Sequence, residues 1–135
     1  MKKKNDTTSI ERDDLIVEFY PHKAVIKEKG KLPDEIRDSF LASLALLAKH
    51  QPPALETDEL VSIGKRVHEL IINGSPAYRC IYTVEVPGKI IVLHACKKTA
   101  EGADRQIKST VELRLKALRS DLKVAAKEAK KAKKK

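Results

Sequence analysis

The sequence has few cysteines and few aromatic residues, and it lacks a long apolar run. Of its 135 residues, 4% are aromatic, none is tryptophan and two are cysteines, Cys80 and Cys96. Both cysteines lie in apolar stretches without CxxC or His/Cys spacing, so we expect small buried side chains in a reducing cytosol and no metal or other cofactor. No uncharged apolar run approaches the roughly 18 residues of a membrane span. The basic start lacks a following apolar segment, which predicts no signal peptide and a cytoplasmic protein.

The net charge of +9 resides in the ends of the chain. Three lysines at residues 2–4 and seven at residues 123–135, set against Glu128, account for all of it. Residues 5–122 carry 18 basic and 18 acidic side chains and are formally neutral. We expect residues 1–12 to form a flexible arm and residues 123–135 to be a frayed helix or disordered, with a folded domain between them at 13–122.

The first half of the domain predicts one strand and one or two helices. Residues 15–20 form a strand candidate that ends at Pro21, and residues 22–31 fit either a strand or a helix. Pro33, followed by two acidic residues, suits the first turn of a helix that continues to about His50. Two prolines end that helix, and residues 52–63 are expected to be a connection.

The second half has the alternation of strands and then the period of a helix. Residues 67–72, 78–86 and 89–96 predict three antiparallel strands, with turns at Asn73–Gly74 and Pro87–Gly88. From about Ala103 apolar residues recur at helical spacing. The sequence therefore predicts an α+β domain, in which a small antiparallel-rich sheet is packed by an N-terminal helix or helical pair and a long C-terminal helix.

Basic residues concentrate on this predicted meander. Residues 65–98 carry six basic side chains against Glu69 and Glu85. Basic groups beside buried apolar positions are typical of a site for an anion, and in a chain with few aromatics we expect that anion to be a nucleic-acid phosphate.

Several short motifs in a fixed order carry a family resemblance. They are L-P-D-E-I-R at 32–37, E-L at 69–70, Y-R-C-I-Y at 78–82, L-H at 93–94 and K-K-T at 97–99. At these residues the sequence resembles the HigB/RelE family of toxin endoribonucleases, in particular the phage-derived HigB-like branch, over residues 14–119. The resemblance implies a RelE-like compact domain. It departs from the family at Ile71, where an arginine is usual, and at Cys96, where phenylalanine is usual.

The resemblance implies a toxin of a type II toxin-antitoxin system that cleaves translated mRNA at the ribosome. The reaction would need no metal or other cofactor, because a ribose 2′-hydroxyl attacks the adjacent phosphate. The implied partners are RNA and a HigA-like antitoxin with a helix-turn-helix. Ile71 in place of arginine favours an alternative, a non-catalytic relative that keeps the fold to bind RNA or the antitoxin. A third hypothesis is a nucleic-acid-binding accessory protein that relies on the lysine tails.

Arg79 is the first candidate for stabilising the phosphate, because a guanidinium stays charged and binds two oxygens at once. Its structural alternative is an ion pair with Glu69 or Glu85 across the sheet. Lys97 and Lys98 are candidates for a second cation, and one of the two is expected to point away.

The acid–base candidates are Glu69 and His68, and Glu69 could instead orient Arg79. We expect His94 to be a satisfied core histidine and Tyr82 to be a core residue. In the same interpretation Lys65, Arg66 and Lys89 bind the RNA backbone. For Lys65 and Arg66 the structural alternative is a solvated loop before a strand.

Overall fold

The computed structural model describes residues 13–98 and 103–133; the predicted arm at residues 1–12 lies outside this range. The elements are β2 (Ile16–Phe19), α1 (His22–Gly30), α2 (Asp34–Ala48), β3 (Glu56–Glu59), β4 (Val67–Ile72), β5 (Ala77–Thr83), β6 (Lys89–Lys98) and α3 (Ala103–Lys133). The five strands form one sheet in the order β2-β6-β5-β4-β3, in which only β2 and β6 are parallel. This confirms the predicted α+β, RelE-like domain.

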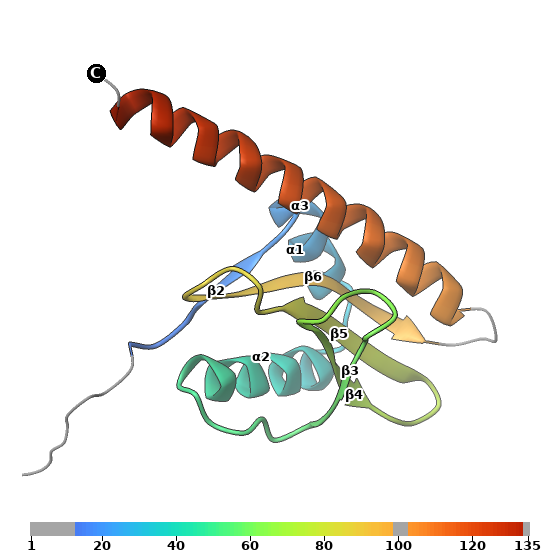
Figure 1. Ribbon diagram of the computed structural model, residues 1–135. Helices are drawn as coiled ribbons and strands as arrows, with labels where there is room; N and C mark the ends of the chain where they lie inside the picture. The colour runs from blue at the N-terminus through green and yellow to red at the C-terminus, as the bar shows by residue number, and fades with distance from the viewer. Residues whose placement is uncertain (1–12, 99–102, 134–135) are drawn as a thin grey trace, which may run out of the picture.

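The two faces of the sheet are covered by different helices, as Figure 1 shows. On one face, Leu70, Tyr82 and Val92 pack with Phe40 and Leu44 of α2. On the other face the core joins alternate strand residues to the apolar stripe of α3, namely Val67, Ile81, Ile91, Leu93, Ile107, Val111, Leu115 and Leu118. A sheet that is covered on both sides needs the near-continuous apolar runs seen in β5 and β6.

The helical elements follow local sequence signals. Segment 22–31, which fits either a strand or a helix by sequence, is the helix α1, with Val25 fully buried. Asp34 and Glu35 occupy the first turn of α2, where the positive end of the helix dipole favours carboxylates. The helix α2 ends at Ala48, two residues before the predicted end. At the next helix, α3 begins at Ala103 as predicted and continues through the lysine-rich segment to Lys133.

The predicted connection at residues 52–63 contains a strand, so this prediction was wrong for residues 56–59. Glu56–Glu59 form the edge strand β3, which pairs antiparallel with β4. All four side chains are exposed, so no alternation of apolar residues signals the strand. Backbone pairing forms it, and the two glutamates and one aspartate at this edge are the kind of charge that discourages further pairing.

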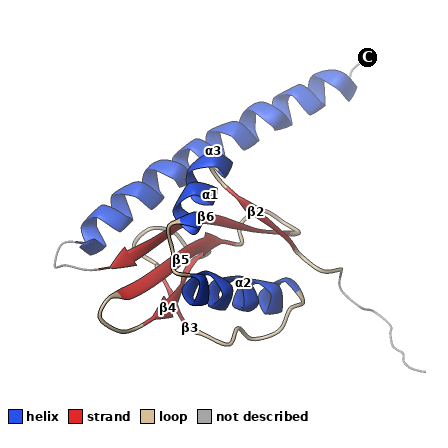
Figure 2. Cartoon of the chain, turned by 180° about the vertical axis from the view of Figure 1, so that it is seen from behind, coloured by secondary structure: helices blue, strands red, loops and turns tan. Residues whose placement is uncertain are grey.

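One edge of β6 is only half covered by another strand. β2 pairs with Lys89–Val92 and ends there, while β6 continues to Lys98. Figure 2 shows α1 beside this edge, between β2 and the overlying α3. Exposed strand edges carry unpaired backbone groups, so side chains of nearby helices have to satisfy them here.

Candidate functional site

Three of the predicted site residues share the face of the sheet toward α3. Arg79 on β5 lies opposite Ile71 of β4 and Cys96 of β6. Because alternate residues of a strand face the same side, Glu69 and Lys98 lie on this face too. The structure therefore brings together Glu69, Arg79 and Lys98 from three neighbouring strands.

The Arg79 side chain is largely occupied by local contacts. It is 9% exposed, and its Nη1 donates to the carbonyls of Tyr78 at 3.0 Å and Ile72 at 3.5 Å. Its Nε lies 3.3 Å from Glu69 Oε1, but in a direction that makes no hydrogen bond, so this is an ion pair held by charge alone. This contact is the structural alternative that the sequence offered for Arg79.

Glu69 titrates unusually for a carboxylate beside an arginine. Burial raises its pKa, and this effect outweighs the opposing charges of Arg79 and Lys98, so the pKa lies above its ordinary value. A carboxyl group with a raised pKa is better suited to proton transfer near neutral pH than an exposed glutamate.

The lysine pair divides between the two faces of the sheet. Lys98 is on the face of Arg79, and its Nζ lies 2.7 Å from Asp104 Oδ1 in the first turn of α3. Lys97 is exposed and lies opposite Tyr78, on the α2 face. This confirms that one of the two points away. Both are the last residues of β6, so the strand is two residues longer than predicted.

The structure places His68 away from Glu69 and Arg79. Its ring stacks on Tyr82 with centroids 5.5 Å apart, and the two residues are paired across β4 and β5 on the α2 face. Tyr82 is 4% exposed, which confirms it as a core residue. His68 therefore does not share a surface with Arg79.

The predicted RNA-contacting residues lie toward the other end of the sheet. Lys65 and Arg66 are exposed and directly precede β4 at Val67, which pairs with Thr83, four residues along β5 from Arg79. Lys89 is at the start of β6, where its Nζ pairs with Glu18 Oε2 at 3.1 Å. These side chains are not part of the Arg79 cluster.

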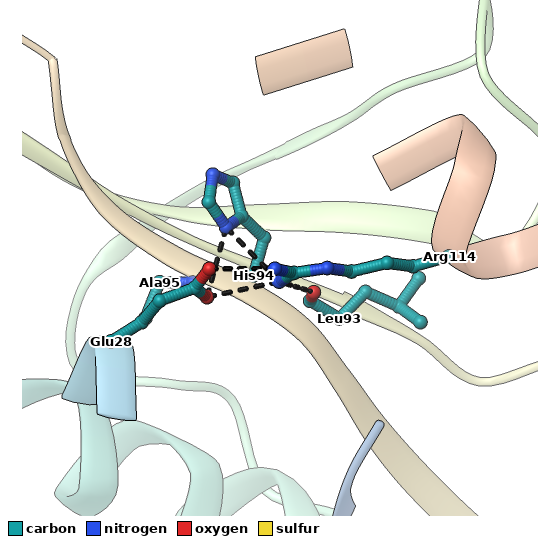
Figure 3. A network of polar contacts seen from close by, with 5 residues as sticks. All are labelled: Glu28, Leu93, His94, Ala95 and Arg114. Carbon is teal, nitrogen blue, oxygen red and sulfur yellow. Dashed lines mark hydrogen bonds and ion pairs between the residues drawn. The ribbon is translucent and has the colours of Figure 1, made fainter. Parts of the chain in front are cut away.

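A second polar cluster, absent from the sequence prediction, lies at the half-covered edge of β6 (Figure 3). It joins Glu28 of α1, His94 of β6 and Arg114 of α3. Arg114 Nη2 lies 2.8 Å from Glu28 Oε2, and its Nη1 lies 3.0 Å from Glu28 Oε1. His94 Nδ1 lies 3.0 Å from Glu28 Oε1. His94 is thus a satisfied histidine, as expected, with partners from two helices that are distant in sequence.

This cluster also satisfies the backbone of the uncovered edge. Glu28 Oε1 accepts from the Ala95 amide at 3.3 Å, and Arg114 Nη1 donates to the Leu93 carbonyl at 2.8 Å. Burial raises the pKa of Glu28, but the hydrogen bonds from His94, Arg114 and Ala95 outweigh it and lower the pKa from 4.5 to about 2. Glu28 therefore stays ionised at any pH near neutrality and fixes the surrounding donors.

A surface depression of about 460 Å³ opens beside this cluster. Its wall combines His94, Cys96, Tyr78 and Lys97 of the sheet with the segment after α1, including Lys31 and Pro33. Burial raises the pKa of the Cys96 thiol to about 12, so this cysteine is a neutral wall residue and no nucleophile. Pockets of this size are suited to small ligands or parts of larger ones.

Within residues 13–98 and 103–133, no three His, Cys, Asp or Glu side chains cluster as metal ligands. None of the helices in these ranges combines the length and apolarity needed to cross a bilayer.

Comparison with curated proteins and with solved structures yields no match. A family model described as phage derived protein Gp49-like (DUF891) matches residues 27–116, a segment that includes α2, the whole antiparallel part of the sheet and the first half of α3. Because this match covers about two thirds of the chain, the chain belongs to the phage-derived Gp49-like (DUF891) family.

Proposed function

We propose that this protein is a HigB-like toxin that cleaves mRNA at the ribosome. Support comes from membership of the phage-derived Gp49-like family together with the convergence of Glu69, Arg79 and Lys98 on one face of the sheet. That convergence is the observation that carries the proposal, since three strands bring a carboxyl group and two cations to one place.

The proposed reaction is attack of a ribose 2′-hydroxyl on the adjacent phosphate, without a metal ion. Arg79 and Lys98 supply the positive charge that the phosphorane-like transition state requires. To reach a phosphate, Lys98 has to break its ion pair with Asp104. The Asp104 side chain is largely exposed, so losing this pair costs little free energy. Glu69 orients the guanidinium of Arg79 through the ion pair at 3.3 Å.

The proposed partners are mRNA on the ribosome and a HigA-like antitoxin with a helix-turn-helix. Because the ribosome would present the mRNA, the protein would not need a deep groove of its own to recognise the RNA sequence. Lys65, Arg66 and the lysines of α3 beyond Leu122 then contribute salt-dependent attraction to RNA backbone at a distance from Arg79.

A second candidate function is a non-catalytic relative that binds RNA or an antitoxin. Two observations favour it: Ile71 stands directly opposite Arg79, where the family has arginine, and the Arg79 guanidinium already binds two carbonyls. In this case the residue is a structural brace of the β4–β5 turn.

Induced expression separates the two candidates. The wild type is expected to arrest growth, and Arg79→Ala to relieve the arrest, with an exposed arginine of α3 changed in Arg105→Ala as the matched control. Circular dichroism and thermal melting of each purified variant identify any loss of folding. A folded Arg79→Ala protein that is as toxic as the wild type contradicts the role of Arg79, and a non-toxic wild type supports the binding module.

A further inference from the structure

His94 is held on one side only. Its Nδ1 contacts Glu28 and Arg114, whereas the second ring nitrogen points away from both (Figure 3). The same histidine lines the depression of about 460 Å³ at the edge of β6. A histidine fixed by a carboxylate through one nitrogen, with the other nitrogen directed elsewhere, is the arrangement that proton-transfer histidines use.

The contacts of Arg114 decide which nitrogen of His94 carries the proton. Arg114 Nη1 has two hydrogens, and two oxygens accept them, Leu93 O at 2.8 Å and Glu28 Oε1 at 3.0 Å. His94 Nδ1 is more distant from this nitrogen, at 3.3 Å, so it is not needed as an acceptor. Nδ1–H therefore donates to Glu28, and Nε2 of the neutral ring has a free lone pair.

We infer that His94 is the base that removes the 2′-hydroxyl proton, and that the depression beside it binds the reacting nucleotide. This inference rests on the proposed ribonuclease function and adds a binding place and a proton acceptor to it. Glu28 acts as a positioning residue, because its carboxylate is occupied by His94, Arg114 and the Ala95 amide.

The register of the sheet sets His94 near the predicted phosphate site. His94 lies opposite Ile81 and Cys96 opposite Arg79, so His94 and Arg79 are diagonal neighbours on one face. Such neighbours lie about 7 to 8 Å apart, with their Cβ atoms somewhat closer, so His94 is one strand and two residues away from the predicted phosphate site. Cys96, which lies between them, also lines the depression.

The lining of the depression has the chemistry of a nucleotide site. Lys31 and Lys97 are exposed at its rim and suit a phosphate, while Tyr78 and Pro33 provide apolar surface for a base or sugar. The charged groups around His94 are Glu28 from α1, Arg114 from α3, the two rim lysines and, across the neighbouring strands, the Glu69–Arg79 ion pair. Their sum is positive, as an RNA-binding surface requires.

The proposed cleavage transfers the phosphorus from the 5′ oxygen to the 2′ oxygen. The 2′-hydroxyl proton passes to His94 Nε2 while the 2′ oxygen bonds to phosphorus and the bond from phosphorus to the 5′ oxygen breaks. The 5′ oxygen takes a proton from water, and the imidazolium returns its proton to the hydroxide that remains. The products are a 2′,3′-cyclic phosphate and a 5′-hydroxyl end.

His94→Asn is the sharpest variant, because the asparagine amide can still donate to Glu28 but has no basic nitrogen at the position of Nε2. We expect cleavage of ribosome-bound mRNA to fall by about 100-fold or more. The wild-type rate should fall toward acidic pH, and this limb should vanish in the variant. His22→Asn, which changes an exposed histidine at the start of α1, is the control. An unchanged rate and pH profile in His94→Asn would overturn the inference.

A binding measurement keeps the inference testable apart from catalysis. A short oligonucleotide with 2′-fluoro sugars cannot react, and its titration should move the His94 imidazole resonance, assigned by its absence in His94→Asn. Tyr78→Ala and Lys97→Ala should weaken this binding at least threefold. If the wild type cleaves RNA but the resonance does not move, the inference about His94 fails and the proposed ribonuclease function stands. If the resonance moves and nothing is cleaved, the nucleotide site stands and the proposed ribonuclease function fails.

Discussion

Glu28 and Arg114 are 86 residues apart in the sequence and form a two-bond ion pair across the edge of β6. The pair joins α1 to α3, and both side chains also bind the β6 backbone, through Ala95 and Leu93. One carboxylate and one guanidinium thus replace the strand that β6 lacks on this side beyond Val92. Since both groups are mostly buried, each depends on the other for its charge to be satisfied.

Arg114→Met should destabilise the fold by about 2 to 4 kcal/mol, because it leaves the Glu28 carboxylate and the Leu93 carbonyl without their main donor. Chemical denaturation followed by circular dichroism measures the change in the free energy of unfolding. Arg105→Met, at an exposed position of the same helix, should change stability by less than about 0.5 kcal/mol. Equal effects of the two substitutions would show that the ion pair contributes nothing.

Lowering the pH should lower the free energy of unfolding, because it protonates the Glu28 carboxylate. Its pKa is depressed from 4.5 to about 2 in the folded state, so its contribution to stability is present above pH 4.5 and is lost as the pH falls toward 2. Glu28→Gln should therefore lower the free energy of unfolding at pH 7 and make it depend less on pH between 5 and 2. Denaturant midpoints measured at several pH values test this. If the midpoint depended on pH in the same way in the wild type and in the variant, the prediction would be contradicted.

Gly64→Ala should destabilise the fold by about 1 kcal/mol. A Cβ at this position would lie 3.2 Å from Val67 Cγ2, closer than ordinary van der Waals contact, and 3.5 Å from Arg119 Nη2 of α3. Gly30→Ala is the matched control, since nothing lies within 4 Å of its Cβ and the substitution should be neutral or slightly stabilising. Thermal melting compares the two variants. An unchanged melting temperature for Gly64→Ala would indicate that the loop shifts to accommodate the added Cβ.

Deletion of residues 123–135 should leave stability almost unchanged. The side chains of residues 123–129 are all exposed, and Figure 1 shows this end of α3 extending beyond the sheet. RNA affinity should fall and its dependence on salt should become shallower, because the segment carries seven lysines. Filter binding at several salt concentrations measures both, and complete loss of binding with intact folding would favour the accessory-protein hypothesis.

The elements with clear apolar periods were predictable from sequence. The meander and the helices α2 and α3 follow alternation or helical spacing, and Pro33 marks the start of α2. Residues 22–31 were ambiguous because Val25 and Ile26 suit a strand as well as a helix. Strand β3 gave no signal, since every side chain is polar and exposed and only backbone pairing forms it.

The candidate site was predictable only where local patterns assign its residues to strands. Local patterns place Glu69 and Arg79 on strands of one sheet and Lys98 just after a third strand, and alternation separates Lys97 from Lys98. The edge cluster could not be placed in this way, because Glu28 and Arg114 come from helices whose contact depends on tertiary packing. The one local signal of the edge cluster was His94 in an apolar strand, since an imidazole in such a strand needs polar partners.

The most direct test of the central claim is end-group analysis of mRNA from ribosomes incubated with the purified protein. Primer extension locates the cuts, and the ends are then assayed for a 2′,3′-cyclic phosphate and a 5′-hydroxyl. We expect both end groups with the wild type and no cuts with a folded Arg79→Ala protein. Uncut mRNA with the wild type, or products with 5′-phosphate ends, would contradict the account.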